Sequence, residues 1–350
     1  IEVGPDGKVY VGTAVYGGSA HFVRLDPLKK SWDDLFNTHA VTRETGVGLD
    51  SQSKFHAKPV VDADGLIWIA TKQGNEEFTY RPEYGESRTG YPGGHLFAYN
   101  PQTGEIIDRG ILLAQEGLMG GVIDTARRRL YYVSDPKSHF LIYDIAKNTV
   151  RDLGVAAPTP RYMAMDNNAR VYFVSVSPPG YDGPCLNMYD PAADRLYTLG
   201  VQVEGADPKA YVSPYVLVAS ADGAKLFGAG MGGTCVMEYD TATVTLGKAG
   251  GFINGTVVCR LVDGVPPGDE HAGTRGQDGG FYFNSGDKLI RYLPQTRTVT
   301  VLGTIVAPGT WQGIHAQGAA VGADGTLYMK CIYPYQVLAF DQLTAPAGGK

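Results

Sequence analysis

Short apolar and aromatic runs alternate with turn residues along the whole chain, and one arrangement of them recurs seven times. Each copy opens with a small turn, usually Asp-Gly, continues into an apolar-aromatic strand, and after a gap gives a second strand that ends in an aromatic residue and Asp. The seven apolar pairs are Val9-Tyr10, Ile67-Trp68, Leu130-Tyr131, Val171-Tyr172, Leu226-Phe227, Phe281-Tyr282 and Leu327-Tyr328. One copy cannot bury its apolar face alone, so the repeat indicates units that stack on their neighbours.

The repeat predicts an all-β chain folded as a seven-bladed β-propeller of four-stranded antiparallel blades, since such blades take about 40–50 residues each. We expect residues 1–350 to form a single propeller domain. The 47 Gly and 21 Pro supply its many turns. Before Asp6-Gly7 there is room only for the tail of a first strand, and no clear fourth strand follows Phe340-Asp341. We therefore expect a closing segment upstream of Ile1, where a signal peptide would lie.

Composition narrows the classes of function. A net charge of −6 without a basic stripe argues against nucleic acid, because its binding depends on Lys and Arg at the phosphates. No apolar run approaches the roughly 20 residues of a membrane span. Four cysteines without C-x-x-C spacing favour buried thiols, with a Cys185–Cys235 disulfide left open. We expect a secreted or periplasmic monomer.

Aligning the seven copies of the repeat shows which residues occupy equivalent positions, and these positions suggest candidate site residues. At the start of the third strand of each blade, the copies carry His21, His95, His139, Cys185, Cys235, Lys288 and Gln336. Residues i and i+4 on a strand share a face, which favours a packing role for His21 and His139. His95 differs because the long loop 72–94 precedes it, and long loops that contain aromatic and charged residues are often functional.

The start of the first strand gives a second set in register, namely His56, Leu118, Pro160, Pro214 and Ala316. His56 is the only ionisable residue among them, and Arg161 and His315 are each one step from the same level. Repeat geometry therefore predicts a ring of site residues at one end of the blades. Its members would be His56, His95, Arg161, Tyr162 and His315, with His139, Lys58 and the loop residues Tyr80, Arg88 and Tyr91 as further contacts to a substrate.

These residue types suit proton transfer beside a carboxylate. Arginine can grip a carboxylate bidentately, and His or Tyr can remove a proton from the neighbouring carbon and protonate the leaving oxygen. Glycoside hydrolysis would ordinarily need two flanking carboxylates, for which only the loop residues Glu76, Glu77, Glu83 and Glu86 cluster. The histidines show neither H-x-x-x-H nor H-E-x-x-H spacing, so the sequence does not predict a metal site among them. The chemistry needs no cofactor. The sequence leaves undecided whether the protein binds a structural divalent cation.

Several stretches carry a family resemblance. FHAKPVVDADGLIWIAT at 55–71, GYPGGHLFAYNPQTGE at 90–105, SHFLIYD at 138–144 and PRYMAMD at 160–166 resemble the seven-bladed propeller polysaccharide lyases, the ulvan lyases and rhamnose–glucuronate lyases, with their α-L-rhamnosidase relatives. The resemblance implies a His pair at His56 and His95 and a carboxylate neutraliser at Arg161. The family's Tyr has no clear counterpart; His139, Tyr132, Tyr143 and Tyr162 are the alternatives.

Three functions remain open from the sequence. The first is a lyase that cleaves an acidic, uronic-acid-containing polysaccharide by β-elimination. The second is a rhamnosidase-type glycoside hydrolase on the same scaffold, where a single His carries the reaction. The third is a non-catalytic propeller that binds a glycan or a protein, because one fold hosts many functions.

Overall fold

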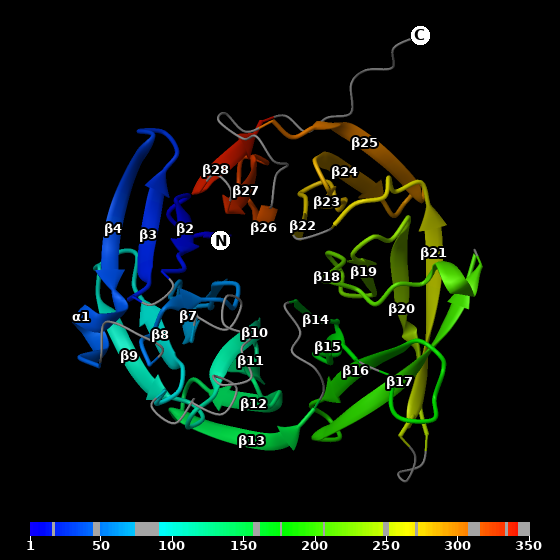
Figure 1. The fold of residues 1–350 in the computed structure, drawn as a ribbon, viewed down its shortest axis with the longest axis horizontal. Coiled ribbons are helices and arrows are strands. Elements are labelled where there is room, and N and C mark those ends of the chain that lie inside the picture. The colour runs from blue at the N-terminus through cyan, green and yellow to red at the C-terminus, as the bar shows by residue number, and fades with distance from the viewer. Residues whose placement is uncertain are drawn as a thin grey trace. The chain divides into compact units, whose positions relative to one another are not determined.

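The computed structural model describes residues 1–15, 18–44, 50–73, 91–156, 162–175, 177–205, 207–247, 252–269, 272–306, 316–332 and 335–341. The chain divides into two compact units, Ile1–Arg161 and Tyr162–Lys350, and each is described by itself (Figure 1). Within the described residues, no helix has the length and apolar character needed to cross a membrane.

The described residues of the first unit form three antiparallel sheets, whose strands pair in sequence order except that β6 lies off the path of the second sheet. The first sheet holds β1 (Glu2–Val3), β2 (Val9–Gly12), β3 (His21–Asp26) and β4 (Ser31–Asn37). The second holds β5 (Lys54–Phe55), β6 (Val60–Val61), β7 (Ile67–Lys72), β8 (His95–Tyr99) and β9 (Ile106–Ile111), with β5 and β6 both paired to β7. The third holds β10 (Gly117–Asp124), β11 (Arg129–Asp135), β12 (His139–Asp144) and β13 (Thr149–Val155).

The second unit begins with an eight-stranded sheet that joins two antiparallel meanders through the parallel pair β17 and β21. Its strands are β14 (Met163–Met165), β15 (Val171–Val174), β16 (Cys185–Asp190), β17 (Arg195–Glu204), β18 (Val216–Ala219), β19 (Lys225–Ala229), β20 (Cys235–Leu246) and β21 (Gly255–Asp263), with the 3-10 helix η2 (Pro208–Ala210) between the meanders. The remaining sheets are β22 (Gly273–Arg275), β23 (Phe281–Ser285), β24 (Lys288–Leu293) and β25 (Thr298–Thr304), then β26 (Ala316–Val321), β27 (Leu327–Ile332) and β28 (Tyr335–Phe340).

The all-β prediction is confirmed for the described residues. Each of the seven apolar pairs lies in the second strand of an antiparallel meander, from β2 to β27. In the second unit the first strands of successive meanders contact one another, β14 with β18, β18 with β22 and β22 with β26; in the first unit β10 contacts β6 and β7. All four cysteines are buried free thiols, so the Cys185–Cys235 disulfide that the sequence left as an alternative does not form.

The aspartate that recurs before the second strands has a structural role in the turn that leads into the strand. Asp62 Oδ1 accepts hydrogen bonds of 2.9 Å from the backbone N–H groups of Asp64 and Leu66, and its Oδ2 accepts one of 2.7 Å from the indole of Trp68. A carboxylate that closes a turn in this way competes well with water for the backbone donors. The same bond to a second-strand aromatic recurs in Asp6–Tyr10, Asp166–Tyr172 and Asp278–Tyr282. One side chain therefore fixes both the turn and the buried ring.

Helix α1 (Thr38–Thr42) follows β4 and is a difference from the sequence prediction, which placed no helix there. The side chain of Asn37 caps it by accepting a hydrogen bond of 3.3 Å from Ala40 N. The helix ends at Arg43, whose φ of 64° lies in the left-handed region. Asparagine is a strong N-cap residue, but a five-residue helix has too few turns to give a periodic apolar pattern. The turn at Arg43 brings Glu44 toward the second sheet.

Candidate functional site

Two polar clusters lie at the end of the second sheet where β7 finishes and β8 begins, on opposite faces of the sheet. On one face Phe55 of β5 packs with its ring centroid 6.2 Å from that of Phe97 in β8. On the other face Lys72 of β7 lies against β10, where a Cβ atom on Gly117 would come within 2.4 Å of Lys72 Cβ. Successive side chains of a strand alternate between faces, so each cluster draws on alternate residues.

The two histidines predicted as a pair belong to different clusters. His95 stacks on Phe97, with ring centroids 5.8 Å apart and an interplanar angle of 16°. His56 lies on the face of Lys72, where its Nδ1 is 3.1 Å from the carbonyl oxygen of Met119 in β10. The structure therefore places both at the same end of one sheet and directs them to opposite faces. They do not form a bonded His pair.

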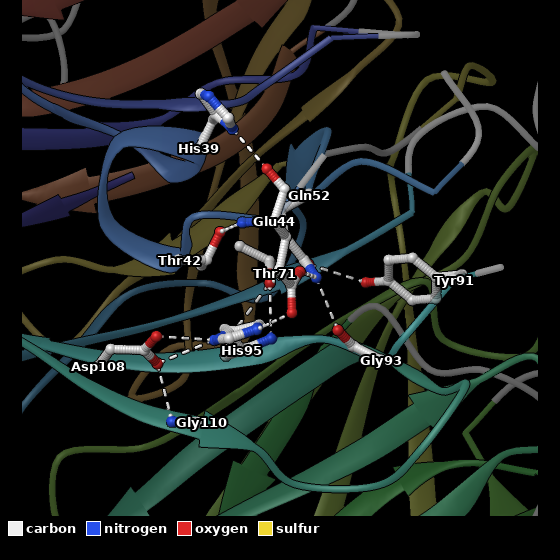
Figure 2. A network of polar contacts seen from close by, with 10 residues as sticks. All are labelled: His39, Thr42, Glu44, Gln52, Thr71, Tyr91, Gly93, His95, Asp108 and Gly110. Atoms are coloured by element: carbon white, nitrogen blue, oxygen red, sulfur yellow. Dashed lines mark hydrogen bonds and ion pairs between the residues drawn. The ribbon is translucent and has the colours of Figure 1, made fainter. Parts of the chain in front are cut away.

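His95 is held between two carboxylates (Figure 2). Its Nε2 lies 2.8 Å from Glu44 Oε1, and its Nδ1 lies 2.9 Å from both carboxylate oxygens of Asp108. A carboxylate can only accept, so both ring nitrogens donate and the ring is an imidazolium. Burial opposes this charge most strongly, but the hydrogen bonds to Asp108 and Glu44 outweigh it and raise the pKa of His95.

Gln52 completes the same arrangement. Its Nε2 donates to Glu44 Oε2 and to the carbonyl oxygen of Gly93, each at 2.8 Å. Its Oε1 accepts from Thr71 Oγ1 at 2.8 Å and from the Tyr91 hydroxyl at 3.1 Å. These partners fix the orientation of the amide, as Figure 2 shows. We call the two donors around the Glu44 carboxylate, His95 Nε2 and Gln52 Nε2, the carboxylate cradle.

The opposite face carries what we call the Lys72 cluster, made of Lys72, Asp135, Met119 and His56. Lys72 Nζ lies 3.3 Å from Asp135 Oδ2 and 3.6 Å from Met119 Sδ, and its side chain is 5% exposed. A buried ammonium is strongly destabilising unless it is paired, and Asp135 of β11 supplies that pair. Met119 thus contacts both the ammonium, through its sulfur, and His56, through its carbonyl.

His56 has a defined tautomer in this cluster. A main-chain carbonyl can only accept, so the Nδ1 of His56 carries hydrogen and donates it to Met119 O. In the neutral ring the lone pair is then on Nε2. His56 is half-buried, and it follows directly after β5, so strand pairing with β7 fixes its backbone. His56 therefore donates through one ring nitrogen to a main-chain carbonyl, whereas both ring nitrogens of His95 donate to carboxylates.

A buried carboxylate, Glu116, organises the turn beside the Lys72 cluster. Glu116 is 1% exposed, and its Oε2 accepts from Ser134 Oγ at 2.8 Å and from Lys137 N at 2.9 Å. Ser134 Oγ in turn accepts from His139 N at 3.0 Å. Asp135, the ion-pair partner of Lys72, lies in the same turn. Glu116, which directly precedes β10, therefore holds the segment between β11 and β12 next to Asp135.

Sequence reasoning missed Glu44, Gln52, Lys72 and Asp108, although one signal pointed to Asp108. Each histidine at the start of a third strand bonds through Nδ1 to an aspartate 13 residues later, at distances of 2.7 to 2.9 Å. The pairs are His21–Asp34, His95–Asp108 and His139–Asp152. A spacing repeated three times was visible in the sequence. It supports a structural role for His21 and His139, because the pair recurs wherever this histidine does.

The other predicted site residues fall in several places. Tyr91 is buried in the cradle network, and Lys58 Nζ forms an ion pair of 3.1 Å with Glu2. Tyr162 belongs to the second unit, with its ring centroid 6.5 Å from that of Tyr215. Four predictions lie outside the described residues: Arg161, His315, Tyr80 and Arg88. No group of three or more potential metal ligands occurs among the residues that the structure describes.

Comparison with known proteins shows the fold alone. No family model and no curated protein matches the chain. An extracellular domain of BT4673 from B. thetaiotaomicron has a TM-score of 0.59 and 9% identity, over 96% of this chain and 39% of that chain. U3-55K gives 0.59 and 10%, over 95% and 86%. Kuenenia stuttgartiensis hydrazine synthase gives 0.57 and 14%, over 98% and 95%. The chain spans about two fifths of the BT4673 structure.

Proposed function

We propose that this protein is a polysaccharide lyase that cleaves a uronic-acid-containing glycan by β-elimination, on a seven-bladed β-propeller. The propeller is supported by the sevenfold repeat and by seven successive meanders among the described residues, with contacts between neighbouring first strands within each unit. The lyase is supported by the resemblance of 55–71 and 90–105 to ulvan and rhamnose–glucuronate lyases. The stretch 55–71 contains His56 of the Lys72 cluster, and the stretch 90–105 contains His95 of the carboxylate cradle.

The observation that carries the proposal is the hydrogen bond of 3.1 Å between His56 Nδ1 and Met119 O. It leaves the lone pair of the neutral imidazole on Nε2, as a general base requires. In the reaction His56 Nε2 takes the C5 proton of the uronate, and the electron pair of that C–H bond forms an enolate with the carboxylate. The C4–O bond then breaks, a C4–C5 double bond forms, and the departing oxygen takes up the proton that His56 Nε2 removed, which returns His56 to its neutral form.

The enolate dianion needs a fixed cation. By the resemblance that cation is Arg161, which can hold the uronate carboxylate bidentately. His95 has another role in this account, because both its nitrogens already donate to carboxylates. It is a positioning residue that binds charge and removes no proton. His56 therefore carries the proton transfer by itself.

The same proposal includes a site of action outside the cytoplasm, either secreted or periplasmic, since acidic polysaccharides of this kind are met there. The BT4673 structure, similar in fold, is an extracellular domain by its own description. The partner would be an acidic polysaccharide or oligosaccharide, bound by a monomer.

The test is to incubate the full chain with ulvan, gum arabic and other uronate glycans while following the ultraviolet absorbance of unsaturated uronate and the release of reducing ends. The proposal expects both signals to rise together. Reducing ends without absorbance would replace it with the hydrolase, and binding without either signal would replace it with a glycan-binding module. A His56→Gln variant should lose both signals, with His21→Gln as the matched control, because His21 is at a repeat position on another sheet.

A further inference from the structure

We infer that His95 and Gln52 form a binding site for the carboxylate of an acidic sugar, and that Glu44 of the same chain occupies this site until the ligand displaces it. That the ligand is a sugar rests on the proposed function, while the carboxylate chemistry rests on the contacts of the cradle. The carboxylate cradle is then a substrate subsite, and Glu44 is an internal competitor for it.

The geometry is that of a bidentate carboxylate receptor. His95 Nε2 donates to one oxygen of Glu44 and Gln52 Nε2 donates to the other, both at 2.8 Å. Two donors aimed at the two oxygens of one carboxylate give charge-assisted hydrogen bonds with geometric specificity. Any other carboxylate of similar shape can accept the same pair of bonds.

The two donors are preorganised. Gln52 is 2% exposed and His95 is 6% exposed, and each is fixed by further partners. Thr71 Oγ1 bonds both residues, since it donates to Gln52 Oε1 and accepts from His95 N, each at 2.8 Å. A site whose donors are already ordered loses little conformational entropy when a ligand binds.

The charges favour an exchange of one carboxylate for another. His95 faces Asp108 from β9 and Glu44 from the segment after α1, and its other described polar neighbours, Gln52 and Thr71, are neutral. Replacing the Glu44 carboxylate by a uronate carboxylate keeps the imidazolium between two anions. A neutral sugar would instead leave it with Asp108 alone, and buried charges that lose a partner are costly. The cradle therefore discriminates for acidic ligands.

Glu44 differs from the two donors in how it is held. Its side chain is 23% exposed, compared with 8% for His95. It reaches the cradle from beyond the C-terminal end of α1, whereas Gln52, Thr71 and His95 lie in or beside the second sheet. A tethered group of this kind acts at an effective concentration on the order of millimolar. The apparent affinity for a free carboxylate falls by the fraction of molecules in which Glu44 has left the cradle.

The experiment is a calorimetric titration of the full chain with sodium glucuronate, glucose and sodium acetate. Four variants are compared with the parent: Glu44→Ala, Glu44→Gln, Glu44→Ala with Gln52→Ala, and Glu105→Ala. Glu105 is an exposed glutamate of the same sheet, in the turn between β8 and β9, and serves as the matched control. Binding is measured without turnover, so failure of the lyase reaction and failure of the cradle give separate results.

We expect Glu44→Ala to bind glucuronate about tenfold more tightly than the parent, because the internal competitor is gone. Glu44→Gln should lie between them, since its amide oxygen can still accept one of the two bonds. The Gln52→Ala addition should cancel the gain, glucose should not bind, and Glu105→Ala should match the parent. Unchanged affinity in both Glu44 variants, or a gain that survives Gln52→Ala, would overturn the inference. Equal affinities for acetate and glucuronate would overturn its link to sugars.

Discussion

His95 donates a hydrogen bond of 2.8 Å from Nε2 to Glu44 Oε1 and thereby joins the segment after α1 to the second sheet. Asp108 of β9 holds the other ring nitrogen at 2.9 Å, so one buried imidazolium links the second sheet to the segment after α1. Both ring nitrogens of His95 are therefore engaged as donors to carboxylates. On the opposite face of the sheet, His56 donates through Nδ1 to Met119 O.

The first prediction concerns the pH dependence of stability at His95. Its pKa in the folded chain is raised above the usual 6.5, so its contribution is fully present below about pH 6.5 and is lost as pH rises through the folded pKa. His95→Gln should lower the free energy of unfolding in acid by about 1.5–3 kcal/mol for each charged hydrogen bond lost. Urea unfolding of both proteins across the pH range measures this. A difference that does not shrink in alkali would contradict the imidazolium.

The second prediction concerns His56 as the base. His56→Gln should reduce kcat by about 10²–10⁴-fold while leaving KM nearly unchanged, since a general base acts in the transition state. The amide of Gln can still donate to Met119 O, so thermal unfolding should match the parent. Initial rates of unsaturated uronate formation give both constants. Retention of the parent kcat would remove His56 from the mechanism.

The third prediction tests the close approach of β7 and β10. Gly117→Ala would place a Cβ atom 2.4 Å from Lys72 Cβ and 2.9 Å from Lys72 Cα, and the backbone would have to shift. Overpacking of this kind costs about 1–3 kcal/mol of stability. Gly303→Ala is the matched control, because a Cβ at Gly303 meets no atom within 4 Å. Denaturant unfolding should separate the two variants, and equal stabilities would contradict the packing of these strands.

The fourth prediction concerns the buried carboxylate of Glu238 in the second unit. Burial opposes its charge most strongly, but hydrogen bonds from Lys225 and Tyr292 outweigh this effect and lower the pKa of Glu238. Its contribution is therefore present above about pH 4.5 and is lost as pH falls through the folded pKa. Glu238→Gln should cost about 3 kcal/mol at neutral pH, because Lys225 loses its buried partner.

Unfolding of the Glu238→Gln variant and the parent should converge in acid. A loss of stability that stays the same as pH falls from 7 through the acid range would show that the Glu238 carboxylate is not the charged group. Thermal unfolding at a series of pH values is sufficient, because the comparison needs only the difference between the two proteins.

The strands were predictable because their signal is local. Asp62, Leu66 and Trp68 lie within seven residues of one another, and the turn carboxylate bonds both the backbone and the indole. A bond from a turn aspartate to a second-strand aromatic is seen in four copies, at a spacing of four or six residues. The short turn followed by an apolar-aromatic pair recurs in all seven, so the seven second strands could be placed from sequence. Helix α1 could not, since a five-residue helix leaves only its Asn37 cap as a signal.

The candidate site was predictable only in part, because its contacts join distant residues. The repeat register pointed to His56 and His95, and the long loop 72–94 pointed to Tyr91. The carboxylate on His95 Nε2, however, comes from Glu44, 51 residues earlier. The face of the sheet toward which His56 points also depends on the break between β5, which ends at Phe55, and β6, which begins at Val60. For that reason the sequence predicted His56 and His95 as one pair, whereas the structure divides them between two faces.

The proposed elimination is tested most directly by the fate of solvent oxygen. Ulvan is digested in heavy-oxygen water and the released oligosaccharides are weighed by mass spectrometry, with products incubated without protein as the exchange control. Elimination breaks the C4–O bond and leaves the original oxygen on the new reducing end. The account predicts unsaturated products without label above the control, and one heavy oxygen at each new reducing end would contradict it.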